Sequence, residues 1–243
     1  MKKHIPNIIT LLNLFCGSIA AVFVVNDDFI TASFLVFLGI FFDFFDGFAA
    51  RKLEVQSDLG LQLDSLADMV TCGLVPGLVM YKLFLLADTS WEYTNVYSFG
   101  FSNFSLLPFI GLFITLASAY RLANFNLDEE QQSYFKGLPT PANALFILSL
   151  PLMIEFQNND VINTVILNKW FLIVVTLLSC YMLNSGIKLF ALKFKTWDFK
   201  TNATRYIFIF LCALFIIVLQ FMAIPIIIVT YVVMSLLDSL TTK

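Results

Sequence analysis

The sequence predicts an all-α, polytopic membrane protein with about eight spans, and two observations support this fold class. Hydrophobic residues make up 59% of the 243-residue chain and charged residues only 13%, whereas soluble domains contain about 45–50% apolar residues. The apolar residues recur in runs along the whole chain, and a spanning helix needs roughly 20 of them. Transmembrane β-strands alternate apolar and polar residues, and the run 216–234 shows no such alternation.

Eight apolar segments are expected to form helices, with no internal repeat and no separate soluble domain between them. The last two are short and separated mainly by Pro225, which leaves open whether they are two spans, one bent hairpin or one miscounted span. Phe15 is bulky where lipoprotein processing at Cys16 would need a small residue, so the first segment is expected to remain a span. The eight segments lie near 5–25, 29–50, 61–87, 106–126, 141–157, 168–187, 205–222 and 224–240.

The basic residues predict the orientation, because cytoplasmic loops retain Lys and Arg. With an even number of spans and a cytoplasmic N-terminus, only Lys82 and Lys169 of the 14 basic residues fall near the outer face. We therefore expect both termini in the cytoplasm. The basic residues placed inside are Lys2, Lys3, Arg51, Lys52, Arg121, Lys136, Lys188, Lys193, Lys195, Lys200, Arg205 and Lys243.

Two pairs of aspartates lie at the edges of neighbouring apolar segments. Asp43 and Asp46 are three residues apart near the end of the second segment, and Asp64 and Asp68 are four apart near the start of the third. Residues at these spacings share one face of a helix, so each pair presents two carboxylates in one direction. A short turn around 51–60 would join the helices antiparallel and let the two pairs face each other.

Four carboxylates at the membrane edge repel one another and require a counter-charge, for which Arg51 alone is too little. Ionisable residues in spans are costly and usually functional. Carboxylate oxygens are hard ligands that select Mg²⁺ or Mn²⁺, and four of them suit two divalent cations roughly 3.5–4 Å apart. The sequence therefore predicts a two-cation site with the metal ligands Asp43, Asp46, Asp64 and Asp68.

Small residues beside the aspartates indicate that a phosphate could approach the helix surface. Gly47 and Ala50 remove side chains from the turns next to Asp46, and Gly60 does the same one turn before Asp64. Arg51 offers a planar guanidinium that suits phosphate oxygens. Two metals, a diphosphate and a nearby acceptor together favour substitution at phosphorus.

The stretch 43–68 has the pattern D-x2-D-G-x2-A-R-x8-G-x3-D-x3-D, which resembles the full signature of the CDP-alcohol phosphotransferase family. The resemblance implies a core of six transmembrane helices, a two-metal site near the cytoplasmic face and a homodimer. Here the core would span about 5–190, and two further C-terminal helices would lie within about 205–240. Residues 1–243 would form one integral membrane catalytic domain.

The resemblance also implies roles for single residues. Asp43 and Asp64 would bridge the two metals, Asp46 and Asp68 would complete their coordination, and Asp68 would take the proton from the attacking hydroxyl. The donor would be CDP-diacylglycerol. Its binding residues would be Gly47, Ala50, Arg51, Ser57 and Gly60, together with Asn7 and Thr10 of the N-terminal stretch PNIIT.

Two later stretches bear on the acceptor alcohol. AYRLANFN (119–126) and FKGLPTPANA (135–144) resemble the phosphatidylserine synthase subgroup, although Asn124 stands where that pattern often has Arg. This resemblance implies transfer of a phosphatidyl group to the hydroxyl of L-serine, giving phosphatidylserine and CMP. It also implies that the protein lies in the cytoplasmic membrane of a prokaryote. The serine carboxylate needs a cation, for which Arg121 is the first candidate and Lys136 the second. Arg121 could equally be a side chain snorkelling at a helix end.

Several other readings remain open. A family member could use another acceptor, such as glycerol 3-phosphate or inositol phosphate, with help from a denser basic pocket. A membrane prenyltransferase also binds diphosphate through aspartates, but its two motifs lie on distant helices. A cation transporter would need broken or polar helices at mid-membrane. The only histidine, His4, lies far from the aspartates, which argues against histidine-based catalysis, and no nucleic-acid partner is expected.

Overall fold

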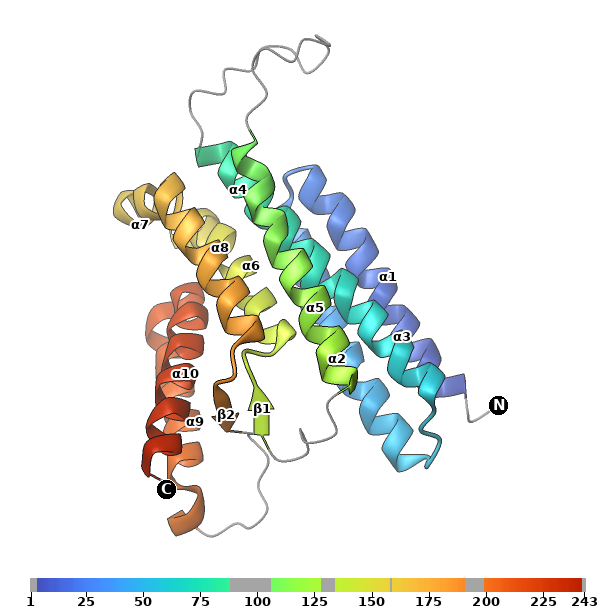
Figure 1. The fold of residues 1–243 in the computed structure, drawn as a ribbon. Helices are drawn as coiled ribbons and strands as arrows, with labels where there is room; N and C mark the ends of the chain where they lie inside the picture. Colours follow the sequence, from blue (N-terminus) through green and yellow to red (C-terminus); the bar gives the residue numbers. More distant parts are fainter. Residues whose placement is uncertain (1–3, 88–105, 128–133, 158, 191–198, 242–243) are drawn as a thin grey trace.

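The computed structural model describes residues 4–87, 106–127, 134–157, 159–190 and 199–241. In this part of the chain the protein is a bundle of long helices with one short pair of strands, which confirms the all-α polytopic class (Figure 1). The basic residues predicted at positions 2, 3, 193, 195 and 243 lie outside the described residues.

The first three apolar segments form the part of the bundle that carries the aspartates. Pro6 occupies the first turn of α1, where its missing N–H costs nothing. Helix α1 packs along α2 and also contacts α3, η2 and α4. The third segment is one long helix interrupted by a π-helical turn. These elements are α1 (Ile5–Val25), α2 (Phe29–Lys52), α3 (Asp58–Asp68), η2 (Met69–Leu74) and α4 (Val75–Ala87).

Helix α4 lies at the centre of the hydrophobic core. Its side chains Val79, Met80, Leu83 and Phe84 are fully buried and pack among α1, α2, α5, α6 and α8. Around this core lie η4 (Leu107–Leu112), α5 (Phe113–Leu127), α6 (Thr140–Gln157), α7 (Asp160–Ile166) and α8 (Lys169–Asn184). The short helix α7 was not expected from the sequence; it begins at Asn159, whose side chain accepts hydrogen bonds from the first turn.

Two short strands, also unexpected from the sequence, pair the connection between α5 and α6 with the segment that follows α8. Strand β1 (Tyr134–Lys136) pairs antiparallel with β2 (Lys188–Phe190), and Lys136 lies opposite Lys188. Gly137 follows β1 with φ of +73°, and an added Cβ there would lie 2.6 Å from the carbonyl oxygen of Leu183. A glycine is therefore required where the chain turns from the ribbon into α6.

The last two apolar segments form a helical hairpin. Helix α9 (Phe199–Leu219) ends at the turn η5 (Gln220–Met222), and α10 (Ala223–Thr241) packs back along it. The rings of Phe208 and Tyr231 are 5.6 Å apart, whereas a continuous helix would separate them by roughly 35 Å. The chain reverses at Gln220, which has φ of 52°, and not at Pro225.

The number of spans stays a prediction. Within the described residues, five helices are long and apolar enough to cross a membrane, or six if α7 and α8, which meet at 62°, form one broken span. The stretch Thr204–Leu237 counts as one of the five, although it contains the hairpin. Large apolar side chains are exposed on the outer faces, Phe34 and Phe44 among them, as expected for surfaces in contact with lipid.

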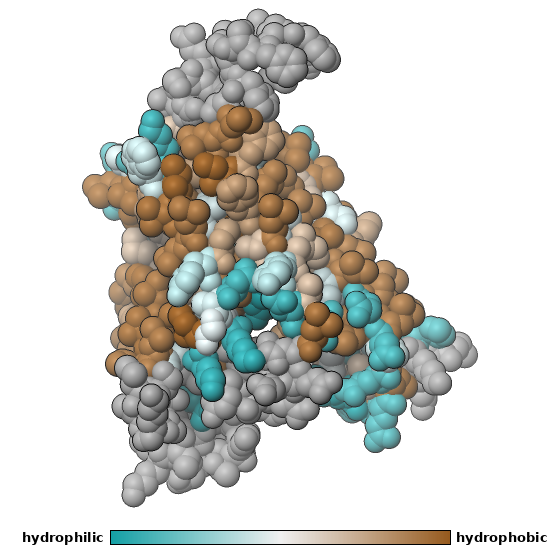
Figure 2. Space-filling model, viewed as in Figure 1, coloured by the Kyte–Doolittle hydropathy of each residue, from teal (hydrophilic) through white to brown (hydrophobic). Residues whose placement is uncertain are grey.

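The apolar surface and the polar end of the bundle are visible in Figure 2, where brown side chains cover most of the helices. Hydrophilic residues gather around a hollow in the lower half of that view, towards the end at which α1 begins. At the opposite end, Lys82 forms an ion pair of 2.7 Å with Asp27, which ties α4 to the turn between α1 and α2.

Candidate active site

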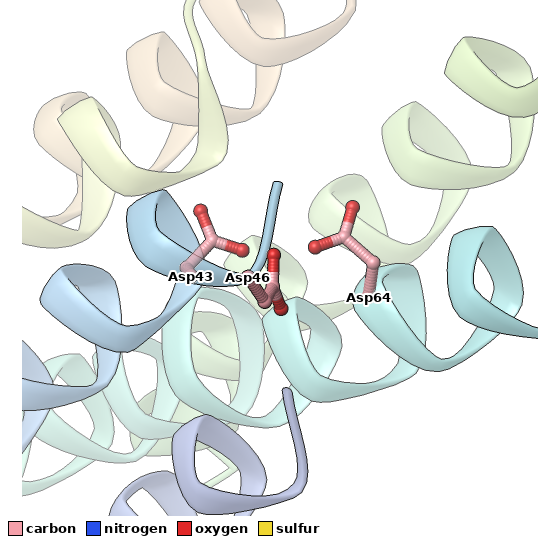
Figure 3. Close-up of side chains that lie close together, drawn as sticks. All are labelled: Asp43, Asp46 and Asp64. Atoms are coloured by element: carbon pink, nitrogen blue, oxygen red, sulfur yellow. The ribbon is translucent and has the colours of Figure 1, made fainter. Parts of the chain in front are cut away.

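Three of the four aspartates predicted as ligands lie together. Asp43 and Asp46 project from the last turns of α2, and Asp64 projects from α3 towards them (Figure 3). Each contributes one carboxylate oxygen to a group whose members lie within 4.8 Å of one another. Asp46 is buried, and Asp43 and Asp64 are partly buried. Helix α1 packs against both α2 and α3.

The three carboxylates fit a divalent cation. The carboxyl groups of Asp43 and Asp64 are within hydrogen-bonding reach of each other, an arrangement that two charged carboxylates hold only with a cation or a proton between them. Oxygen donors in this number suit Mg²⁺ or Mn²⁺. In the described part of the chain no lysine or arginine pairs with them directly. A metal is therefore the counter-charge that the donor set favours.

Thr10 of α1 holds one of these carboxylates. Its hydroxyl lies 2.5 Å from Oδ2 of Asp46 and 3.0 Å from the carbonyl oxygen of Pro6. Thr10 is buried. The sequence predicts Thr10 as a donor-binding residue, and its hydrogen bond also orients Asp46.

Asp68 lies apart from this group. It is one turn further along α3 than Asp64, it is only 8% exposed, and it is not part of the three-carboxylate group. Its Oδ1 lies 3.4 Å from Nδ2 of Asn13 in α1. Asp68 is thus a buried carboxylate outside the group, bonded to a buried side chain of α1.

A cleft of about 790 Å³ opens beside the aspartate group. Its size is within the range of about 300–1,000 Å³ that is typical of small-molecule sites. The walls come from the start of α1, the end of α2, the connection that follows and the start of α3. All seven residues predicted for the donor line it, namely Asn7, Thr10, Gly47, Ala50, Arg51, Ser57 and Gly60, together with Asp43, Asp46 and Asp64.

Local geometry explains why glycines stand in this cleft. Ser57 caps α3, and its hydroxyl accepts a hydrogen bond of 3.1 Å from the backbone N–H of Gly60. A Cβ on Gly60 would lie 3.3 Å from Oγ of Ser57 and 3.4 Å from Oδ1 of Asn7. Gly47 faces the guanidinium of Arg51, whose Nη1 would be 3.5 Å from a Cβ there. These glycines leave the polar groups of the cleft accessible to a ligand.

The stretch 119–126 lies next to the aspartates. Arg121 is 8% exposed and close enough to Asp68 for their opposite charges to interact. Phe125 lines the cleft, and its ring centre is 5.9 Å from the guanidinium of Arg121. Asn126 hydrogen-bonds Ser65 of α3 at 2.9 Å. By contrast, Lys136 lies in β1 and is not among the lining residues.

Sequence reasoning missed Asn13, Thr71 and Asn126. Asn13 and Thr71 are fully buried and hydrogen-bonded to each other, although they are 58 positions apart in the chain. Asn13 follows Thr10 by three residues and shares its helix face. Two polar side chains on one face of an otherwise apolar span were the signal that could have identified Asn13 as a site residue.

Comparison with known proteins gives the family. The family described as CDP-alcohol phosphatidyltransferase matches residues 3–181, which include every aspartate and cleft residue named above. The chain belongs to this family. The sequence-based interpretation as an enzyme of phosphatidyl transfer is therefore confirmed. The C-terminal hairpin α9–α10 lies outside the matched region.

Individual relatives agree with the family assignment. A CDP-diacylglycerol–serine O-phosphatidyltransferase of Bacillus subtilis is 35% identical over 152 residues, 61% of this chain and 75% of the relative. The enzyme of the same name from Helicobacter pylori is 28% identical over 206 residues, 84% of this chain and 79% of the relative. An archaetidylserine synthase of Methanothermobacter thermautotrophicus is 27% identical over 148 residues, 60% of this chain and 56% of the relative.

The aspartate group yields a prediction about metal binding. Asp64→Asn should weaken Mn²⁺ binding at least about tenfold, because loss of a ligand should cost no less than loss of a residue that supports one. Titration calorimetry of the purified protein would measure the affinity. The control is Asp160→Asn in the first turn of α7, an exposed position outside the group. Equal Mn²⁺ affinity in the wild type and Asp64→Asn would remove Asp64 from the site.

Proposed function

We propose that the protein transfers the phosphatidyl group of CDP-diacylglycerol to the hydroxyl of L-serine, forming phosphatidylserine and CMP. The observation that carries this proposal is a cleft lined by three clustered carboxylates, with a buried arginine beside a fourth. The names of the relatives support serine as the acceptor. Because the chain belongs to the family, the prenyltransferase and transporter readings are set aside.

The cleft would bind the cytidine diphosphate part of the donor. Arg51 at its rim offers up to five N–H groups to phosphate oxygens, and the N-terminus of α3 beside Ser57 adds backbone N–H donors. The apolar faces of α1 and α2 next to the cleft carry exposed side chains such as Ile8 and Phe44. The acyl chains would lie along these faces, in the lipid.

Asp43, Asp46 and Asp64 would hold the divalent cations, and we propose two of them, Mg²⁺ or Mn²⁺, with Asp68 contributing to the second. When bound, such ions neutralise the diphosphate and make its phosphorus more electrophilic. Thr10 would keep Asp46 in its orientation. The protein would thus align the diphosphate so that the bond to CMP lies opposite the incoming hydroxyl.

Asp68 would act as the general base. The serine oxygen forms a bond to the phosphatidyl phosphorus while the bond from that phosphorus to the CMP oxygen breaks. The serine hydroxyl proton passes to the Asp68 carboxylate, and CMP leaves with the electron pair. The burial of Asp68 would keep bulk water from competing with serine as the nucleophile.

Arg121 would bind the serine carboxylate. Its Nε is buried and has no hydrogen-bond partner among the described residues, an arrangement that leaves a charged donor available for a ligand. A buried arginine without a ligand is costly, so a role in binding accounts for it better than snorkelling at a helix end. Lys136, in the ribbon, is the second candidate.

The protein would work at the cytoplasmic face of a prokaryotic membrane. The cleft lies at the end of the bundle where Arg51 and Lys52 terminate α2, and basic residues favour the cytoplasm. We expect a homodimer, as the resemblance to the family implies, in which lipid or a second subunit covers the exposed apolar helix faces.

The acceptor can be identified by CMP release from CDP-diacylglycerol with Mg²⁺ or Mn²⁺ present. We expect release with serine and none with glycerol 3-phosphate or inositol phosphate, because one arginine can neutralise a single carboxylate, whereas a buried phosphate dianion needs more than one positive charge. Release of CMP only with a phosphorylated alcohol would agree with the family assignment but would refute serine as the acceptor.

The role of Asp68 can be tested by the isosteric change Asp68→Asn. The turnover number kcat should fall by about 10²–10⁴-fold, the usual contribution of a general base. Binding of the donor, measured by calorimetry with CDP-diacylglycerol in detergent, should persist because the residue does not line the cleft. A variant that retains activity would exclude Asp68 as the base.

Arg121→Gln should raise KM for serine at least about 30-fold, since loss of a buried charged partner costs roughly 2 kcal/mol or more. The KM for CDP-diacylglycerol should change little. Arg205→Gln in α9 provides the same substitution outside the family-matched region. If both variants keep the wild-type KM for serine, Arg121 does not bind the acceptor.

A further inference from the structure

Three buried side chains form a hydrogen-bonded chain that ends on Asp68. The hydroxyl of Thr71 donates to Oδ1 of Asn13 at 2.8 Å and lies 3.2 Å from the backbone carbonyl oxygen of Asn13. Nδ2 of Asn13 in turn donates to Oδ1 of Asp68 at 3.4 Å. Thr71 and Asn13 are fully buried, so water does not compete for these bonds.

The direction of the chain follows from the chemistry of the groups. A carboxylate only accepts hydrogen bonds, so Asn13 must present its NH₂ group to Asp68. Its carbonyl oxygen then faces the other way and needs a donor, which the Thr71 hydroxyl supplies. Thr71 therefore fixes the orientation of the Asn13 amide, and Asn13 fixes the Asp68 carboxylate.

The surrounding backbone is shaped to admit this chain. A Cβ on Gly39 of α2 would lie 2.8 Å from Oδ1 of Asn13 and 2.8 Å from Cγ2 of Thr71, and a Cβ on Gly17 of α1 would lie 2.9 Å from Cα of Thr71. Two helices thus carry glycine where Asn13 and Thr71 meet. Thr71 also lies in η2, the π-helical turn that directly follows Asp68, and such turns are frequent at functional sites.

Asp68 and Arg121 are close but unpaired. Their opposite charges interact, yet the described residues contain no ion pair between them. In a buried setting such charges attract strongly. The hydrogen bond from Asn13 gives Oδ1 of Asp68 a different partner.

We propose that Asn13 and Thr71 are positioning residues that hold the Asp68 carboxylate for proton transfer and keep it off Arg121. This inference rests on the proposed function, in which Asp68 is the base. With Oδ1 held by Asn13, Oδ2 is directed at the acceptor hydroxyl, and the Arg121 guanidinium stays accessible to the acceptor carboxylate. Neither positioning residue needs to touch a substrate.

The first test compares Thr71→Val, which replaces the hydroxyl by a methyl of similar size, with Thr71→Ser, which keeps the hydroxyl. In the CMP-release assay, Thr71→Val should lower kcat about 10- to 100-fold, the usual effect of losing a residue that orients a catalytic ligand. Thr71→Ser should stay within about threefold of wild type. KM for CDP-diacylglycerol should be unchanged in both.

Thr176→Val is the matched control. Thr176 is also fully buried, but its hydroxyl bonds only the backbone carbonyl of Leu172 in its own helix, α8. This variant should keep the wild-type kcat. If Thr176→Val loses as much activity as Thr71→Val, or if Thr71→Ser is as impaired as Thr71→Val, the effect is one of packing and the proposal is wrong.

The second test is a double-mutant cycle. Asn13→Leu has similar volume and removes both bonds, so it should lower kcat at least as much as Thr71→Val. Because Thr71 acts through Asn13, adding Thr71→Val to Asn13→Leu should cause no further loss. If the losses in kcat of the two single variants multiply in the double variant, the two effects are independent packing effects. That result would refute the proposal that Thr71 acts through Asn13.

The assay separates this inference from the proposed acceptor. The variants are compared with whichever alcohol supports CMP release by the wild type. If serine alone fails, serine is refuted as the acceptor, and the positioning role of Asn13 and Thr71 can still be tested with the alcohol that works. A wild-type kcat in both Thr71→Val and Asn13→Leu would refute the positioning role of Asn13 and Thr71, while the proposed function would stand. No release with any alcohol would overturn both.

Discussion

The structure depends on keeping several carboxylates at the edge of a hydrophobic bundle without letting them repel one another apart. Asp43, Asp46 and Asp64 converge within 4.8 Å, and in the described part of the chain no basic side chain pairs with them. Such charges are tolerated in a membrane protein only with polar partners or a bound cation. The cleft, the glycines around it and the buried threonine and asparagine of α1 all serve this requirement.

Helix α1 is the element that supplies the polar partners. Thr10 and Asn13 lie three residues apart on one face, and each bonds the second aspartate of a pair, Asp46 and Asp68. Helix α1 packs against both α2 and α3, and its polar face bonds a carboxylate of each. One helix therefore orients side chains from both aspartate pairs.

The site has a cleft and a buried region. Asp43, Asp46 and Asp64 border the cleft, whereas Asp68, Asn13 and Thr71 are buried and do not line it. This division suits a reaction in which a charged diphosphate binds at the membrane surface while proton transfer occurs where water is scarce. Arg121, from a helix that belongs to neither aspartate pair, lies beside the buried region.

Much of this protein could be predicted from sequence alone, because the relevant signals are local. Runs of apolar residues indicated the helices, and the spacing of the aspartates on single helix faces indicated two carboxylate pairs turned towards each other. The positions of Gly47, Arg51 and Gly60 pointed to a ligand cleft, and all three line it. These features follow from one helix or one connection, so no long-range contact was needed to infer them.

Other features were decided only by tertiary structure. The sequence predicted all four aspartates as metal ligands, but only three converge in the structure, while Asp68 accepts a hydrogen bond from Asn13 of α1. The π-helical turn, the ribbon that pairs Lys136 with Lys188, and the reversal at Gln220 depend on contacts between distant segments. Periodicity records which face of a helix is apolar, but a partner 58 positions away, such as Thr71 for Asn13, is fixed only when the helices pack.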